Sequence, residues 1–190
     1  SGKSSMKHLI HHTAIIHKGA KIDHNVSIGP YSVIGPNVKI GKNSNIFSHV
    51  IIDGYTEIGT SNQIYPFSVI GSNPQHYKYS GEITELSIGD NNVIREHVTI
   101  HPGTQVGTKI TKIGNDGFFM VGSHIAHDCE IGNNVIFVNN AVIGGHVKID
   151  DYVYLGGQSA VHQFCRIGKH AIIGAGTTID GDVIPFTSVV

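Results

Sequence analysis

Residues 28–41 read IGPYSVIGPNVKIG, and they decide the fold because isoleucine returns at every sixth position. The same spacing holds isoleucine at every sixth residue from 10 to 70. A second series runs from 113 to 179, with Ile, Leu, Val or Phe at every sixth residue. A helix needs apolar residues three and four apart, and a half-buried strand needs them every second residue. Neither period fits.

A repeat of six residues predicts a parallel β-helix, in which each block supplies one short strand and one turn. Three blocks complete one triangular coil, so the coil repeats every eighteen residues. The aliphatic residue and the small residue four positions later, such as Ile28 with Ser32, are predicted to point inward. Glycine often follows the aliphatic, as at Gly29 and Gly41, and we expect these corners to adopt unusual backbone dihedrals.

Two segments break the rhythm. Residues 72–87, SNPQHYKYSGEITELS, place His76 and Glu82 where apolar residues are expected, which predicts a polar loop leaving the coil. Between Ile100 and Ile113 the phase slips by one residue, which predicts a second excursion around QVGTKITK, residues 105–112. Long loops inside a compact repeat are usually functional.

Composition excludes several classes of protein. The 190 residues carry a formal net charge of -1, with a pI of about 6.9, so no nucleic-acid partner is expected. No apolar run approaches the roughly 18 residues that span a bilayer. The N-terminal SGKSSMKHLI also lacks the apolar core of a signal peptide. We therefore expect a cytoplasmic protein that does not span a membrane.

Domain organisation is predicted to be simple. Residues 1–7 are interpreted as an N-terminal extension left by cloning, and residues 8–190 as one β-helix domain. Cys129 and Cys165 each follow an aliphatic residue by four positions, so both are predicted to fill the core. They lie two coils apart, which is too far for a disulfide.

The eighteen-residue coil predicts where polar side chains meet. Ile125, Ile143 and Val161 should stack, with successive coils about 4.8 Å apart. Their neighbours then share one corner region in three consecutive coils: His127 with Asp128, Gly145 with His146, and His162 with Gln163. Three imidazoles, a carboxylate and an amide on one patch predict a chemical site.

The residue types of this patch suit acyl transfer. An imidazole can accept a proton from a hydroxyl near neutral pH, and a neighbouring carboxylate can fix its tautomer. His127 and Asp128 offer that pair, and a backbone N–H at the Gly144-Gly145 turn is a candidate oxyanion donor. No serine or cysteine is evidently placed as a nucleophile beside these histidines. This favours direct transfer over a covalent intermediate.

Five segments carry a resemblance to a known family: IGPYSVIGPNVKIG, IREHVTIHPGT, SHIAHDC, GGHVKIDD and AVHQFCRIG. Over residues 9–190 the chain resembles the UDP-N-acetylglucosamine O-acyltransferases of lipid A biosynthesis. The resemblance implies an all-β, left-handed parallel β-helix that works as a homotrimer without metal or cofactor. It also implies transfer of an (R)-3-hydroxyacyl chain from acyl carrier protein to the sugar 3-hydroxyl.

Carried over by position, the resemblance implies that His127 is the general base, Asp128 its partner, and the Gly145 amide the oxyanion donor. It further implies an acyl-length ruler at Ala175. The remaining residues implied to bind substrate are Gln75, Lys78, His101, His124, His146, His162 and Gln163.

The chain departs from the family pattern in three places. His76 follows Gln75 where the family has aspartate, which removes the contact that this carboxylate would make. Gly174 is followed by Ala175 where the family often has a second glycine, and the added methyl is expected to shorten the preferred acyl chain. The family continues into a helical C-terminal domain, which the resemblance implies is missing from this chain.

Three other functions stay open at this point. A related sugar-nucleotide N-acyltransferase shares the coil and a catalytic histidine, although the AVHQFC and TIH segments favour the O-acyltransferase. A zinc-dependent carbonic anhydrase is built on the same coil. Its expected H-x4-H spacing occurs only as His12 and His17, far from the stacked histidines. A catalytically silent trimeric scaffold is the third alternative.

Overall fold

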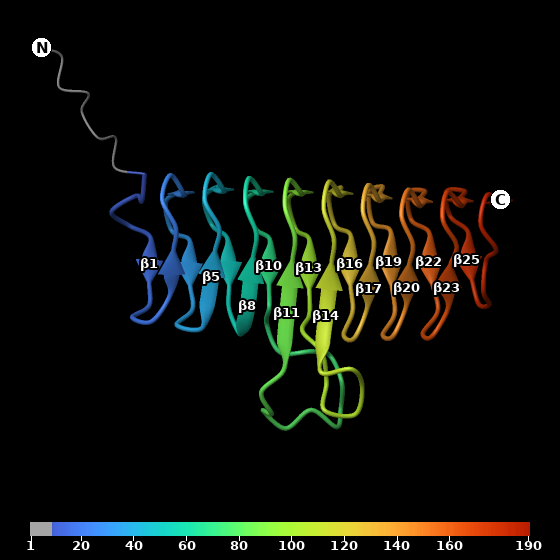
Figure 1. Cartoon of the computed structure of the whole chain (residues 1–190), viewed down its shortest axis with the longest axis horizontal. Coiled ribbons are helices and arrows are strands. Elements are labelled where there is room, and N and C mark those ends of the chain that lie inside the picture. Colours follow the sequence, from blue (N-terminus) through green and yellow to red (C-terminus); the bar gives the residue numbers. More distant parts are fainter. Residues whose placement is uncertain (1–8) are drawn as a thin grey trace, which may run out of the picture.

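Strands of two to four residues alternate with turns along the whole of residues 9–190, the part of the chain that the computed structural model describes. The predicted extension at residues 1–7 lies outside this part. The strands stack into successive coils along one axis (Figure 1), and all of their pairings are parallel. No helix of residues 9–190 has the length and apolar character needed to cross a membrane.

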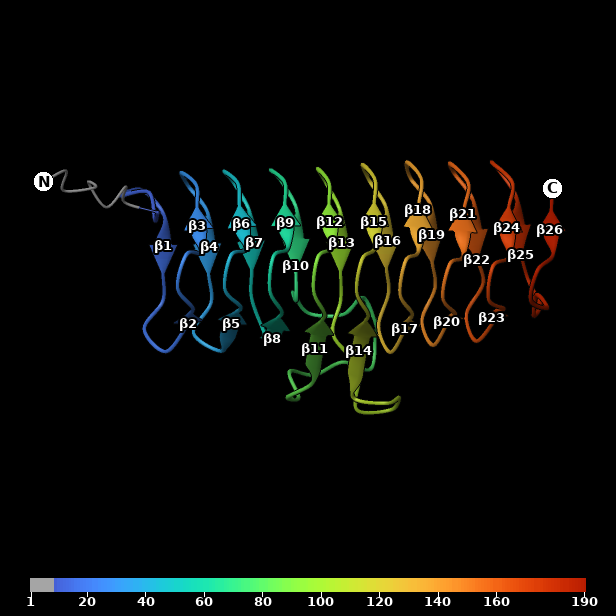
Figure 2. The same ribbon diagram turned by 45° about the horizontal axis from the view of Figure 1, so that its top comes forward.

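The strands form three sheets that are the three faces of a triangular prism (Figure 2). Sheet 1 contains β1 (Ile15–Ile16), β4 (Val33–Ile34), β7 (Ile51–Ile52), β10 (Val69–Ile70), β13 (Thr99–Ile100), β16 (His124–Ile125), β19 (Val142–Ile143), β22 (Ala160–Val161) and β25 (Thr178–Ile179). Sheet 2 contains β2 (Lys21–Ile22), β5 (Val38–Ile40), β8 (Tyr55–Ile58), β11 (Glu85–Ile88), β14 (Ile110–Ile113), β17 (Glu130–Ile131), β20 (Lys148–Ile149) and β23 (Arg166–Ile167). Sheet 3 contains β3 (Ser27–Ile28), β6 (Asn45–Ile46), β9 (Gln63–Ile64), β12 (Val93–Ile94), β15 (Phe118–Phe119), β18 (Ile136–Phe137), β21 (Tyr154–Leu155), β24 (Ile172–Ile173) and β26 (Ser188–Val189).

The chain visits the sheets in the order 1, 2, 3, so each coil turns three corners. We call the turn from sheet 1 to sheet 2 the first corner, that from sheet 2 to sheet 3 the second corner, and that from sheet 3 to sheet 1 the third corner. In each sheet, residues eighteen apart pair directly, as Ile16 does with Ile34. The chain is therefore a left-handed parallel β-helix, whose coil the six-residue period predicts and whose hand the family resemblance implies.

Inward-pointing residues fill the prism completely. From Ile28 onward the repeating aliphatic residues are almost fully buried, with Ile34 and Ile46 at 0% exposure, whereas Ile10 in the first coil is 39% exposed. The small residue four positions later is buried as well, as at Ser32 and Val38. Burying each such aliphatic side chain contributes roughly 1.5–3 kcal/mol, so the core column is the main source of stability.

The glycines after the aliphatics serve a different purpose from the one predicted. Gly29 and Gly41 do not adopt positive φ; the left-handed corner positions are mostly non-glycine residues such as Asn25 and Tyr31. A Cβ on Gly41 would lie 2.5 Å from the backbone oxygen of Gly59 in the next coil. Gly29 and Gly41 need to be glycine because successive coils approach closely, so the predicted reason was wrong there, whereas Gly71, which follows Ile70, does adopt a positive φ of 83°.

Both predicted loop excursions leave the coil at the first corner and project from the same edge (Figure 1). Paired residues on either side of the first loop, Ile58 and Ile88, are 30 apart instead of 18. The twelve extra residues equal two whole repeats, which preserves the phase. Ile88 and Ile113 are 25 apart, so the second loop adds one repeat and one residue, which is the observed slip. Both strands after the loops begin earlier than predicted, at Glu85 and Ile110.

Candidate active site

The polar residues that the eighteen-residue coil predicts to be neighbours lie at the first corner. Because Ile125 pairs with Ile143 and Ile143 with Val161, the residues that follow stack in columns. His127, Gly145 and Gln163 form one column, and Asp128, His146 and Phe164 form the next. Backbone bonds tie the columns together, including His146 N–H to the carbonyl of His127 at 3.0 Å.

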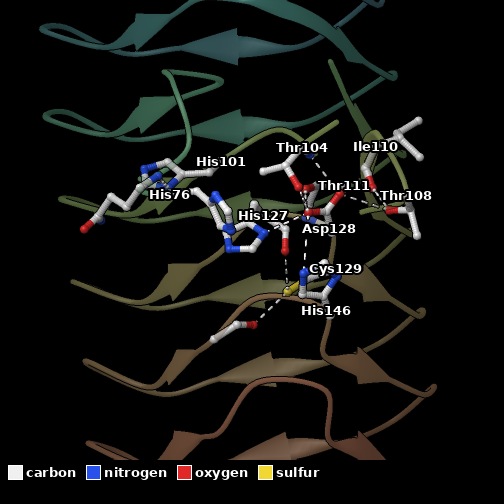
Figure 3. Close-up of polar contacts among 12 residues, drawn as sticks. His76, His101, Thr104, Thr108, Ile110, Thr111, His127, Asp128, Cys129 and His146 are labelled. Atoms are coloured by element: carbon white, nitrogen blue, oxygen red, sulfur yellow. Dashed lines mark hydrogen bonds and ion pairs between the residues drawn. The ribbon is translucent and has the colours of Figure 1, made fainter. Parts of the chain in front are cut away.

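His127 and Asp128 form a buried pair. The Nδ1 of His127 lies 2.8 Å from Oδ2 of Asp128 (Figure 3), and the residues are each 5% exposed. An ionised carboxylate only accepts hydrogen bonds, so Nδ1 must carry a proton. In the neutral ring Nε2 then holds a free lone pair, and it has no hydrogen-bond partner among residues 9–190.

The second loop excursion holds the Asp128 carboxylate. Thr104 donates its N–H to Oδ1 at 2.9 Å and its hydroxyl to Oδ2 at 2.6 Å. The hydroxyl of Thr108 lies 3.3 Å from Oδ1, and Thr111 accepts the backbone N–H of Asp128 at 2.9 Å. A Cβ on Gly107 would lie 2.4 Å from the carboxyl carbon. The loop therefore wraps the carboxylate with donors and leaves no room for a larger residue at 107.

These contacts set the charge of the carboxyl group. Burial on its own raises the pKa of Asp128, but the two hydrogen bonds from Thr104 and that from His127 outweigh it. The pKa of Asp128 therefore lies below its usual range, and the side chain is an anion at neutral pH. An anion at this place stabilises a positive charge on His127 when the imidazole takes up a proton.

Gly145 lies directly against the free side of His127. A Cβ on Gly145 would come within 2.4 Å of Cε1 and 2.6 Å of Nε2 of that ring. The Gly144 N–H and the His146 N–H both bond to neighbouring carbonyls, whereas the Gly145 N–H has no acceptor in the described part of the chain. One free donor and one free acceptor thus lie side by side.

Aromatic rings surround this pair. His146 meets His127 edge to face at 5.0 Å between ring centroids, and Phe164 stacks on His146 at 4.3 Å. His76 from the first loop meets His127 edge to face at 5.1 Å. Burial lowers the pKa of His146, which Asp128 opposes while His127 and His76 add to it.

A second group of predicted residues lies beside the pair. His101 and His124 meet edge to face at 4.9 Å, and the ring of His124 bonds to the Thr99 hydroxyl at 2.7 Å. Burial lowers the pKa of His101 to about 4, helped by His124 and His127, so His101 is neutral at pH 7. Gln75 contacts this group through its backbone N–H, 3.4 Å from His101.

Four predicted residues are not brought to the pair within one chain. Lys78 and Gln75 extend exposed side chains from the first loop. His162 and Gln163 are also exposed, and among residues 9–190 neither side chain makes a hydrogen bond or a ring contact with His127. His162 stacks one column away because it follows Val161 directly, whereas His127 follows Ile125 by two. Ala175 follows β24 and lies at the third corner.

A metal ion could in principle use His127, Asp128 and His146. Each offers one ligand atom, and these atoms lie within 4.8 Å of one another. However, His127 Nδ1 and Asp128 Oδ2 bind each other, so His127 would have to use Nε2. His12 and His17, the pair with the anhydrase-like spacing, lie around β1 in the first coil and contribute nothing to this group.

Sequence reasoning missed several residues of the site. Thr104, Thr108 and His76 lie in loops, and their separation from Asp128 or His127 is not a multiple of eighteen. Phe164 was overlooked because it is apolar, although the stacking rule places it above His146. The phase slip after Ile100 was the available signal, since it marked the loop that holds the carboxylate.

The chain is similar to known transferases in sequence and in structure. The family model described as bacterial transferase hexapeptide (six repeats) matches residues 8–42, 19–54, 110–145 and 146–181. These matches cover more than half of the chain, so the chain belongs to the hexapeptide-repeat transferases.

Curated relatives narrow this class. An acyl-(acyl-carrier-protein)–UDP-N-acetylglucosamine O-acyltransferase of Herminiimonas arsenicoxydans is 51% identical over 95% of this chain and 69% of its own length. That of Xylella fastidiosa is 49% identical over 94% of this chain and 68% of its own length.

Solved structures agree. The UDP-N-acetylglucosamine acyltransferase of Francisella novicida superposes with a TM-score of 0.92 at 44% identity, covering 95% of this chain and 67% of its own. LpxA of Acinetobacter baumannii gives a TM-score of 0.94 at 47% identity, covering 96% and 71%. The chain belongs to the UDP-N-acetylglucosamine O-acyltransferase family.

Proposed function

We propose that this chain transfers an (R)-3-hydroxyacyl group from acyl carrier protein to the 3-hydroxyl of UDP-N-acetylglucosamine, the first step of lipid A biosynthesis. The observation that carries the proposal is the position of His127. Its Nδ1 is bonded to Asp128 at 2.8 Å, while its Nε2 is free and lies on the side of the ring next to Gly145, whose N–H has no acceptor among residues 9–190. The names of the relatives supply the acceptor and the acyl carrier.

The proposed mechanism needs no covalent intermediate on the protein. His127 Nε2 takes the proton of the sugar 3-hydroxyl as that oxygen attacks the acyl carbonyl. The resulting imidazolium is stabilised by the Asp128 anion, 2.8 Å away. The carbonyl oxygen becomes an oxyanion and accepts a hydrogen bond from Gly145 N–H. Collapse of this intermediate expels the carrier, which takes the proton back from His127.

Nucleophilic catalysis by the nearby thiol is a poor alternative. Cys129 follows the pair in sequence, but its side chain points into the core and is 1% exposed. Burial raises the pKa of Cys129 to about 12, so the thiolate required for attack is scarce at neutral pH. This supports direct attack by the sugar hydroxyl.

The remaining predicted residues are assigned to substrate binding. His146 and the neutral His101 and His124 offer polar edges on one side of the pair. Gln75 and Lys78 in the exposed first loop are proposed to bind the sugar nucleotide. We assign the same function to His162 and Gln163, and Ala175 is retained as the acyl-length ruler.

A homotrimer is part of the proposal, because Ala175 lies at the third corner, away from the His127–Asp128 pair within one chain. The outward residues of the faces support an assembly. Sheet 2 exposes a charged row, whereas sheets 1 and 3 expose apolar rows. The apolar rows are Ile15, Val33, Ile51 and Val69 on sheet 1, and Val93, Phe118, Ile136, Tyr154 and Ile172 on sheet 3. Because the two apolar faces, on sheet 1 and sheet 3, are different, sheet 1 of one copy is expected to contact sheet 3 of the next. Such a heterologous contact can close into a ring.

Light scattering of two variants tests the assembly. Ile51 is 42% exposed on sheet 1, and Glu57 lies in the same coil on sheet 2. Ile51→Lys should release monomer, because it places a charge within the apolar row. Glu57→Lys should form an assembly of the same molar mass as the parent. Equal masses for all three proteins would contradict a contact through sheet 1.

The activity is tested with UDP-N-acetylglucosamine and 3-hydroxyacyl carrier proteins of several lengths, following the acylated sugar nucleotide by mass spectrometry. The parent should form product, and His127→Ala should form it at a rate lower by about 10²- to 10⁴-fold. His24→Ala is the matched control, because the His24 side chain is 73% exposed and lies far from the pair. It should behave as the parent does.

The same assay separates the alternatives. Product only on an amino sugar acceptor would identify the related N-acyltransferase. A folded parent that acylates neither acceptor would leave the scaffold function. Ala175→Gly should shift the preferred donor toward a longer chain, and an unchanged preference would remove Ala175 as the ruler.

A further inference from the structure

The thiol of Cys129 contacts the peptide that carries the proposed oxyanion donor. Its Sγ lies 3.1 Å from the carbonyl oxygen of Gly144, and this carbonyl shares one peptide unit with the N–H of Gly145. A trans peptide is planar, and its C=O and N–H point in opposite directions. A bond made to the carbonyl from the core therefore fixes the N–H toward the outside.

We propose that Cys129 is a positioning residue whose S–H···O=C bond to Gly144 orients and strengthens the Gly145 N–H for the oxyanion. The inference deepens the proposed function and rests on it, because it concerns the same reaction and the same donor. Cys129 itself touches no substrate in this proposal, since it lies in the core.

The thiol is able to donate this bond. Burial raises the pKa of Cys129 to about 12, so the sulfur keeps its proton at neutral pH. Two carbonyls are within reach, that of Gly144 at 3.1 Å and that of His127 at 3.8 Å. The proton is directed to the nearer one. The Gly144 oxygen has no other donor among residues 9–190.

The second corner contains three peptides in the same repeat position, directly after a buried isoleucine. In each, an inward side chain donates to the carbonyl: Ser44 to Gly59 at 3.1 Å, Asn62 to Gly89 at 2.8 Å, and Asn92 to Gly114 at 3.0 Å. In each, the N–H on the other side of the peptide donates outward to a side-chain oxygen of the next coil. These outward bonds run from Thr60 to Asp90 at 2.8 Å, from Asp90 to Asn115 at 2.7 Å, and from Asn115 to Asn133 at 2.8 Å.

The Gly144-Gly145 peptide repeats only the inner half of this arrangement. Cys129 follows Ile125 by four positions, as Ser44 follows Ile40, and it donates to the carbonyl fifteen residues on. The outer half is open, because Gln163, which takes the place of Asp90 in the next coil, does not accept the Gly145 N–H. Thr60 shows that a peptide held in this way can donate to a carboxylate oxygen. An oxyanion can occupy the corresponding place beside Gly145.

The bond also affects the strength of the donor. Hydrogen bonds in a chain polarise one another, so a donor on the Gly144 carbonyl makes the Gly145 N–H a better donor. The benefit appears when negative charge develops on the acyl oxygen. It should therefore act on kcat and leave the binding of UDP-N-acetylglucosamine unchanged.

Three variants test the inference. Cys129→Ala removes the donor and should lower kcat by about two- to tenfold at constant KM. Cys129→Ser keeps a donor and should recover most of the rate, since Ser44 makes the same bond. Cys165→Ala is the matched control: Cys165 is buried two coils on in the same column, and its thiol donates no bond within the described chain.

A readout independent of activity separates this inference from the proposed function. The NMR signal of the Gly145 amide proton should move in Cys129→Ala, stay near the parent value in Cys129→Ser, and not respond to Cys165→Ala. An unmoved signal, or an equal loss of kcat in Cys129→Ala and Cys165→Ala, overturns the inference. If the signal moves in Cys129→Ala but the parent does not acylate UDP-N-acetylglucosamine, the proposed function is overturned. The proposed role of Cys129 toward the oxyanion is then overturned with it.

Discussion

The first and second corners of the prism have the same backbone turn but differ in whether its outward N–H group is hydrogen-bonded. In the second corner, N–H groups that point outward donate to side-chain oxygens of the next coil, as Thr60 does to Asp90 and Asn133 does to Asp151. In the first corner, the Gly145 N–H donates to nothing in the described chain, and the His127 ring lies against the same residue. The candidate site thus differs from the second corner by one repeated hydrogen bond that is not made.

The corners also differ in what they require of a carboxylate. In the second corner Asp and Asn perform the same function, since Asp90, Asn115 and Asn133 each accept one N–H through Oδ1. Asp128 in the first corner receives donors on both oxygens and contacts the His127 imidazole, which gains charge in the proposed mechanism. A neutral amide cannot meet those demands.

Replacing the two carboxylates by amides should expose this difference most strongly. Asp128→Asn places an NH₂ group among donors and withdraws the charge behind His127, so kcat should fall by about 10²- to 10⁴-fold. Asp151→Asn in the second corner keeps an oxygen for Asn133 N–H and should retain activity. Steady-state kinetics of both proteins gives the comparison, and equal activities would mean that the charge of Asp128 is dispensable.

Adding one methyl group beside His127 should have the next largest effect. In Gly145→Ala the new Cβ would press on the ring that Asp128 holds, so the imidazole must move, and a shift of this kind can cost about 10²-fold in kcat. Gly157→Ala is the control, because its Cβ would meet Val138 at an ordinary 3.5 Å. Full activity of Gly145→Ala would show that His127 does not act from its observed position.

The same substitution outside the first corner should instead affect stability. In Gly41→Ala the Cβ would lie 2.5 Å from a backbone oxygen of the next coil, so the coils must separate locally. The expected loss is about 1–3 kcal/mol of unfolding free energy, with kcat of the folded protein unchanged. Gly181→Ala meets nothing within 4 Å and should be neutral in the same denaturation experiment.

The sequence predicted the fold well because one physical constraint repeats in every coil. A position that is fully buried, such as Ile34, accepts only an aliphatic residue, so the period can be read directly. The same arithmetic correctly brought His127, Asp128 and His146 together. Stacking rules transfer to the site because its residues lie on the regular coil.

Prediction failed where contacts depend on chain that leaves the coil or on side-chain direction. Thr104 reaches Asp128 from an inserted loop whose path no period describes. His162 stacks in the predicted region, but its column differs from that of His127, so its exposed side chain does not join the pair. The reason for Gly41 was also predicted wrongly, because close approach of two coils and a positive φ both require glycine, and the sequence does not distinguish them.

The smallest expected effect is an acid sensitivity that belongs to the first corner. Burial lowers the pKa of His101 to about 4, whereas the unfolded chain takes up this proton near pH 6.5. Between these values the unfolded state binds more protons, so stability rises with pH and is lost as the pH falls from 6.5 toward 4. His101→Gln should therefore reduce the fall in Tm between pH 7 and pH 5 by a few degrees.

The reduction should be partial and specific to this corner. Burial also lowers the pKa of His124 and His146, so some of the pH dependence must persist in His101→Gln. His24→Gln, which changes an exposed histidine near the second corner, should leave the slope of Tm against pH as in the parent. An identical slope in His101→Gln would mean that the cost of burying neutral imidazoles is not concentrated at the site. The first corner would then differ from the second in its chemistry alone, and not in what it contributes to stability.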